Sequence, residues 1–202
     1  MKLLAKIISV IFHPLLLSTY LVLVLGYFFS AMLMVSPGHL WLMASFVFAF
    51  TFVVPVVNLL IFRYLGSVKS LKMESRQERV MPFIFIAALY VLVAFLFFYK
   101  LPFSANFNKL MIVVAVLVLT STVVTFFLKV SVHSLSIGGM VGILLPLVRF
   151  APALLWPTAG IIALSGVIIS SRLLLDAHTP RETLIGSLAG LVVGYGGMVI
   201  LF

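Results

Sequence analysis

Between two lysines the chain reads Lys109-LMIVVAVLVLTSTVVTFFL-Lys129, a stretch of 19 residues without a charge. A helix of about 20 apolar residues crosses the ~30 Å hydrocarbon core of a bilayer, and a helix satisfies its own backbone groups there. Apolar runs of the same character fill most of the remaining chain. The sequence therefore predicts an all-α fold, a polytopic membrane helix bundle.

The composition agrees with a single integral membrane domain over residues 1–202. Hydrophobic residues make up 64% of the chain and charged residues 8%, with a mean hydropathy of +1.36, whereas soluble domains are about a quarter charged. The net charge of +9 lies in short loops, which is typical of topology signals and argues against a nucleic-acid partner. The chain has no cysteine, which excludes disulfides, thiolate catalysis and cysteine-based metal sites.

The apolar runs predict six to seven transmembrane helices. They cover about residues 7–35, 41–64, 82–100, 109–129, 135–150, 153–175 and 182–202. The first contains His13-Pro14, where we expect a kink. The third is expected to start at Pro82, because proline favours the first turn of a helix.

Three polar segments are predicted to lie at the same face of the membrane. They are residues 66–81, 130–134 and 172–182, and two predicted crossings separate each consecutive pair. The acidic residues of the chain all fall in the first and third segments; they are Glu74, Glu78, Asp176 and Glu182. One face is therefore expected to carry the chemistry.

The third segment, SRLLLDAHTPRE at residues 171–182, is the densest group of ionisable residues. His178 and Glu182 are four residues apart and share a face of a helical turn, so the carboxylate can bond one ring nitrogen and leave the other as a nucleophile. Residues 179–182 also form a Thr-x-x-Glu capping box, so Glu182 has a structural role open to it as well. Arg172 binds an anion or extends its side chain to the membrane surface.

The other two segments carry weaker signals. A histidine at a membrane boundary, such as His133, is more often an interfacial polar residue than a catalyst. On the same face as His178, however, it allows two histidines to share the roles of nucleophile and general acid. Lys72 and Arg79 form a cationic clamp for a phosphoryl group, or else belong to a solvated loop with paired charges or to a contact with anionic lipid.

Taken in order, the three segments resemble the type 2 phosphatidic acid phosphatase superfamily of membrane lipid phosphatases, related to vanadium haloperoxidases. The third motif of that family is Ser-Arg, five residues, His, three residues, Asp. This chain matches it with Ser171-Arg172, His178 and, in place of the aspartate, Glu182.

The first and second motifs match less closely. The family has Lys, six residues, Arg-Pro; this chain has Lys72 and Arg79 with the proline displaced to Pro82, and the pair Lys69 and Arg76 has the same spacing. The family's Pro-Ser-Gly-His is present only as Ser-Val-His at residues 131–133. The resemblance covers about residues 66–200 and implies a core like the phosphatidic acid phosphatase/haloperoxidase fold.

The resemblance implies a catalytic role for three residues. His178 would attack phosphorus and form a phosphohistidine, Glu182 would hold its ring, and His133 would protonate the leaving oxygen and then activate water. The substrate-binding residues implied are Lys72, Arg79, Ser131 and Arg172. The resemblance implies neither a metal ion nor another cofactor.

We therefore expect an integral membrane phosphatase of a lipid phosphomonoester or diphosphate, such as phosphatidate, phosphatidylglycerophosphate, polyprenyl diphosphate or a lipid A phosphate. Alternatives are a non-catalytic member or transporter that binds anionic lipid, and a lipid phosphotransferase. Transport is disfavoured because the span interiors carry few ionisable residues. We expect a bacterial inner membrane protein. The basic residues favour a cytoplasmic site, whereas bacterial relatives commonly have an external one.

Overall fold

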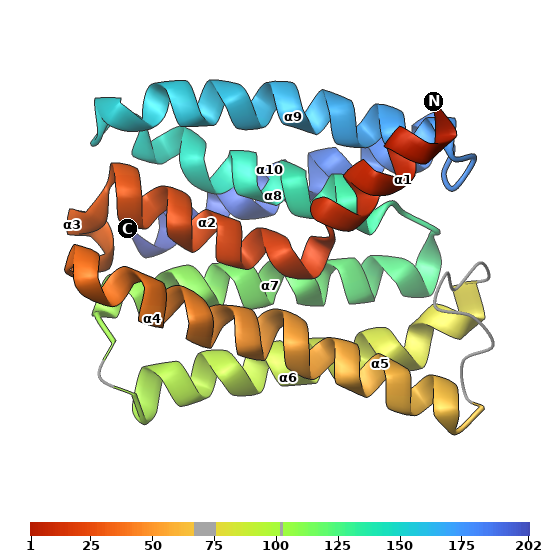
Figure 1. Ribbon diagram of the computed structural model, residues 1–202, viewed down its shortest axis with the longest axis horizontal. Coiled ribbons are helices and arrows are strands. Elements are labelled where there is room, and N and C mark those ends of the chain that lie inside the picture. The colour runs from red at the N-terminus through yellow and green to blue at the C-terminus, as the bar shows by residue number, and fades with distance from the viewer. Residues whose placement is uncertain (67–75, 102) are drawn as a thin grey trace.

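The computed structural model of the protein describes residues 1–66, 76–101 and 103–202, except for the side chains of residues 37 and 76–78. Within these residues the secondary structure is helical and contains no strand. The long helices run roughly along one common axis, and the chain reverses direction at the two ends of the bundle (Figure 1). The prediction of an all-α fold is confirmed.

The N-terminal part of the bundle contains two interrupted helices. Its elements are α1 (Lys2–Ile11), α2 (Pro14–Phe28), α3 (Ser30–Leu33), α4 (Pro37–Phe48), the π-helical η1 (Ala49–Val53) and α5 (Val54–Tyr64). The π turn lies just before Pro55, which has no N–H to donate to the carbonyl oxygen of Thr51. The hydroxyl of Tyr90 donates to that oxygen instead, at 2.9 Å.

The C-terminal part consists of α6 (Arg76–Tyr99), α7 (Ala105–Phe127), α8 (Val132–Leu147), the 3₁₀ turn η2 (Pro152–Leu154), α9 (Leu155–Leu174) and α10 (Pro180–Leu201). The prediction that a helix starts at Pro82 is wrong, because this proline lies inside α6. Arg, Gln and Glu are good helix formers, and residues 76–79 extend the helix by more than a turn before the proline.

In the described part of the chain, five helices are long and apolar enough to cross a membrane: 38–64, 79–99, 105–127, 152–174 and 180–201. The α1–α2 pair, bent by 60° at the predicted kink, is a sixth span if counted as one. The 16 residues of α8 span about 24 Å, less than the ~30 Å hydrocarbon core. The structure thus supports five to six candidate spans, and α8 accounts for the difference from the expected six to seven.

The described parts of the polar segments lie at one end of the bundle. Figure 1 shows the α7–α8 connection, the α9–α10 connection and the start of α6 at the same end, with the N-terminus beside them. The Lys2 ammonium lies 2.9 Å from the Asp176 carboxylate of the α9–α10 connection. This arrangement agrees with the predicted clustering of polar segments and brings the start of α1 to the same end.

Glycines allow α8 and α10 to pack at very short range. A Cβ on Gly190 would overlap the carbonyl oxygen of Leu135, and small residues at such positions permit close helix contact. The glycines at this interface are Gly138 and Gly142 of α8 and Gly186, Gly190 and Gly194 of α10. The contact brings the two helix starts together, where the backbone N–H of Ser131 donates to the carbonyl of Glu182 at 3.2 Å.

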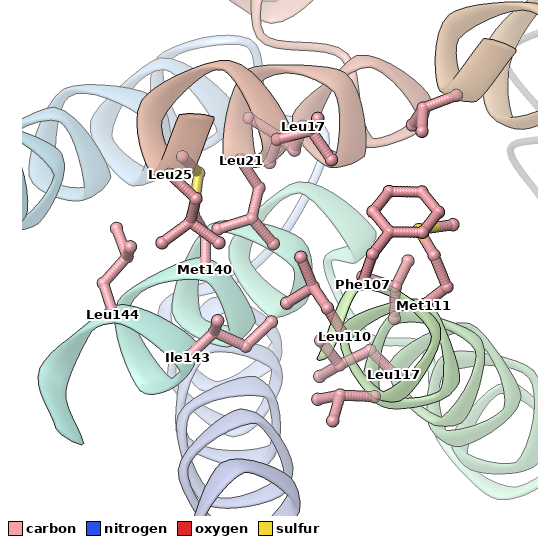
Figure 2. Packing of buried hydrophobic residues seen from close by; sticks show 14 of the residues in the cluster. Leu17, Leu21, Leu25, Phe107, Leu110, Met111, Leu117, Met140, Ile143 and Leu144 are labelled. Carbon is pink, nitrogen blue, oxygen red and sulfur yellow. The ribbon is translucent and has the colours of Figure 1, made fainter. Parts of the chain in front are cut away.

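The buried core joins the N-terminal segment to the rest of the bundle. In Figure 2, leucines of α2 point toward side chains of α7 and α8. Leu25, Leu110 and Leu144, one from each helix, are fully buried. The segment outside the resemblance is therefore packed into the same core as α7 and α8.

Candidate active site

A cavity of about 830 Å³ lies among α1, α2, α6, α7, α8 and the α9–α10 connection. Charged residues and histidines form part of its wall: Lys6, His13, Arg79, Lys129, His133, Arg172, Asp176 and His178. Another part is apolar and includes Leu17, Leu21, Val114, Leu117, Met140 and Ile143. The cavity therefore has the amphipathic lining that a molecule with an anionic head and an apolar tail requires.

His178 and Glu182 are in direct contact. The Nδ1 of His178 lies 2.7 Å from Oε2 of Glu182, and the histidine side chain is only 4% exposed. The Glu182 N–H donates to Oγ1 of Thr179 at 3.3 Å, and Oε2 of Glu182 accepts from the Thr179 N–H at 3.4 Å. Glu182 therefore caps α10 and holds His178 at the same time. A carboxylate acceptor at Nδ1 keeps the proton there and leaves Nε2 with its lone pair.

Electrostatics favour a neutral His178. Burial lowers the pKa of the His178 imidazole; its hydrogen bond to Glu182 opposes this shift, and the charges of Arg79 and Arg172 add to it. A depressed pKa keeps the ring unprotonated at neutral pH, so the Nε2 lone pair is available. The ring thus has the protonation state that a nucleophile needs.

Two arginines face the same cavity. Arg172 donates from Nη1 to the hydroxyl of Ser9 at 3.2 Å, and its buried Nε has no hydrogen-bond partner in the described part of the chain. Arg79 is 8% exposed and interacts electrostatically with Glu182, while the two guanidinium groups repel each other. Two neighbouring cations at a partly buried site favour the binding of an anion, which relieves their repulsion and gives the Nε–H of Arg172 an acceptor.

His133 is held by the N-terminal helix. Its Nε2 lies 3.0 Å from the carbonyl oxygen of Ser9. Because a carbonyl only accepts hydrogen bonds, Nε2 must carry the proton, which leaves Nδ1 as the nitrogen that can gain or lose one. The Ser9 carbonyl thus orients His133 as Glu182 orients His178.

Of the predicted substrate-binding residues, one lies away from the cavity and one lies outside the described residues. Ser131 is fully buried and caps α8: its hydroxyl accepts from the Ser134 N–H at 3.3 Å and from the Ser134 hydroxyl at 3.0 Å. Ser131 is absent from the cavity wall. Lys72 lies outside the described residues, as does Lys69 of the alternative register.

Residues of the N-terminal segment reach the site although they lie outside the motifs. Lys6, Ser9 and His13 line the cavity from α1 and from the α1–α2 break. Their spacing of three and four residues is that of one helix face, a signal present in the sequence. Lys129, just before α8, is a further cation on the wall.

Comparison of the chain with protein-family models, with curated proteins and with solved structures finds no match.

Among the described residues, no group of three or more histidine, aspartate or glutamate side chains is arranged to hold a metal ion. The candidate site therefore consists of a histidine–carboxylate pair, a second oriented histidine and two arginines on one amphipathic cavity.

Proposed function

We propose that the protein is an integral membrane phosphatase that hydrolyses a lipid phosphomonoester or diphosphate through a phosphohistidine at His178. The observation that carries this proposal is the 2.7 Å contact between Nδ1 of His178 and Glu182, on a cavity that also presents Arg79 and Arg172. The contact leaves Nε2 of His178 available for attack, and the arginines match the charge of a phosphoryl group.

The first half-reaction forms the phosphohistidine. The lone pair of His178 Nε2 attacks phosphorus, a P–N bond forms, and the bond from phosphorus to the leaving oxygen breaks. His133, protonated on both nitrogens once the negatively charged phosphoryl group is bound beside it, gives its Nδ1 proton to that oxygen and becomes neutral. Arg79 and Arg172, with Lys72 by resemblance, stabilise the negative charge on the phosphoryl oxygens.

The second half-reaction restores the enzyme. Neutral His133 takes a proton from water at Nδ1, and the water oxygen attacks phosphorus as the P–N bond breaks. Inorganic phosphate leaves, and His178 regains its Nε2 lone pair. Glu182 stabilises the positive charge of the His178 ring while it carries the phosphoryl group.

The apolar wall supports a lipid as the substrate. Side chains such as Leu21, Leu117 and Met140 line the same cavity as the ionisable residues. Apolar surface of this kind stabilises an acyl or prenyl chain by removing it from water. We assign the substrate to the class of phosphatidate, phosphatidylglycerophosphate, polyprenyl diphosphate and lipid A phosphates, and the protein to a bacterial inner membrane.

Phosphate release from a substrate panel tests the function. Purified protein in detergent micelles is incubated with each lipid phosphate of this class and with glycerol phosphate as a tail-free control. We expect release from at least one lipid substrate, inhibition by vanadate and no effect of a metal chelator. Release from no substrate would refute the proposal, and release that requires an added alcohol acceptor would identify a phosphotransferase.

Glu182→Gln separates the two roles of Glu182. Glutamine retains the capping box but removes the negative charge at Nδ1 of His178, so we expect kcat to fall by about 10²-fold with little change in thermal stability. Because Glu182 raises the pKa of His178, its loss should move the acidic limb of the pH–rate profile to lower pH. An unchanged kcat would show that Glu182 acts only as a cap.

Ser9→Ala tests the contact with Arg172. The change removes the hydroxyl that accepts from Arg172 but keeps the carbonyl that holds His133. A hydrogen bond to a charged group contributes about 1.5–3 kcal/mol, so we expect KM to rise about tenfold with a smaller change in kcat. Ser165→Ala is the control, because this exposed hydroxyl donates within α9; equal KM values for the two variants would contradict the prediction.

A further inference from the structure

We propose that His13 is a third histidine of the site and that its Nε2–H donates a hydrogen bond to the phosphoryl group of the substrate. The proposal rests on the proposed function and deepens it. It assigns a substrate-binding residue to the N-terminal segment, outside the region of the motifs.

His13 lies on the cavity wall, beside the other two histidines of the site. It occupies the break between α1 and α2 and lines the same cavity as His133 and His178. The centroids of the His13 and His133 rings are 5.7 Å apart, with the rings nearly perpendicular at 80°. His13 is therefore next to the residue to which we assign proton transfer.

The hydrogen bond at Nδ1 of His13 fixes the position of the ring proton. His13 is the N-cap of α2, and its Nδ1 accepts a hydrogen bond from the backbone N–H of Leu15 at 3.3 Å. An accepting Nδ1 is unprotonated, so the neutral ring carries its hydrogen on Nε2. Among the described residues, none accepts a hydrogen bond from this Nε2. A bound phosphoryl oxygen would be its acceptor.

Capping alone does not account for a histidine at this position. Serine, threonine, asparagine and aspartate are the preferred N-cap residues. A polar aromatic ring at a break in a membrane helix is costly unless it serves a site. The break itself turns the chain by 60°, and His13 lies at this turn, on the cavity wall.

The proposed role of His13 differs from that of His133. Because its Nδ1 is occupied by the Leu15 N–H, His13 remains neutral and transfers no proton. It binds an oxygen on which negative charge increases as the P–N bond forms, and a preorganised donor of this kind lowers the barrier. No covalent bond to His13 forms or breaks during turnover.

His13→Asn is the decisive variant, because asparagine keeps the N-cap acceptor but is too short to place a donor where Nε2 lies. We expect kcat/KM for the lipid substrate to fall about 10²-fold and vanadate inhibition to weaken about tenfold, with an unchanged melting temperature. His39→Asn is the matched control, since His39 lies at the start of α4 and hydrogen-bonds to Ser36. It should behave as the wild type.

Wild-type kcat/KM and vanadate inhibition in His13→Asn would overturn the proposal. Loss of activity in His13→Ala with normal activity in His13→Asn would also overturn it, because this pattern would show that His13 acts only as the N-cap of α2. If His178→Ala loses activity while His13→Asn remains normal, the role of His13 is refuted and the phosphatase function stands. If the wild-type protein is inactive, the phosphatase function itself is refuted. Calorimetric titration with inorganic phosphate tests His13 without turnover: we expect a Kd about tenfold higher for His13→Asn, and an equal Kd contradicts the proposal.

Discussion

Replacement of His178 by alanine is expected to abolish phosphate release from lipid substrates, with a decrease of about 10⁴-fold or more in kcat. The reason is that the imidazole supplies the attacking lone pair in the proposed mechanism, and no other described histidine has a carboxylate partner. The variant should remain folded, because Glu182 keeps its capping contacts with Thr179. The measurement is phosphate release at matched protein concentration in micelles.

The same variant tests the covalent intermediate. Wild-type protein quenched during turnover with a ³²P-labelled substrate should retain an acid-labile, alkali-stable label, and His178→Ala should retain none. His39→Ala, at the start of α4, serves as the control for histidine loss as such. Equal release by wild type and His178→Ala would exclude a phosphohistidine at His178 and show that hydrolysis follows another route.

Gly190→Ala is expected to destabilise the protein by about 3 kcal/mol or more, because a methyl group is forced into a closely packed interface. Its Cβ would overlap the carbonyl oxygen of Leu135 and approach the backbone nitrogen of Gly139 at 2.7 Å. These are backbone atoms, so relief requires α8 and α10 to move apart. That movement would also separate His133, at the start of α8, from Glu182, at the start of α10, and we expect activity to fall as well.

Gly196→Ala provides the matched control on the same helix. A Cβ on Gly196 has no neighbour within 4 Å, and alanine is favoured over glycine in a helix by about 1 kcal/mol. We expect this variant to be as stable as the wild type or slightly more stable. Thermal unfolding in detergent, followed by circular dichroism, measures both changes. Equal melting temperatures for the two variants would show that the α8–α10 contact does not limit stability.

Local features of the bundle could be predicted from the sequence. Apolar runs such as Lys109–Lys129 predict helices, because a lipid environment requires each backbone segment to satisfy its own hydrogen bonds. Thr179 and Glu182, three residues apart, predict the capping box that starts α10, and His13-Pro14 predicts the break between α1 and α2. Each of these depends on residues that are close together in the chain.

The tertiary structure alone decided which segments complete the site. Contacts of Ser9 with His133 and Arg172 join residues 124 and 163 positions apart, and Ser131 points into the α8 cap instead of the cavity. Such pairings depend on how the helices pack. Glycine positions and side-chain shapes determine this packing together, and no local sequence pattern encodes it. The sequence by itself determined the helices, their caps and the end of the bundle at which the polar residues gather. Packing of α1 against α9 and of α2 against α8 decided that the N-terminal segment forms part of the cavity wall.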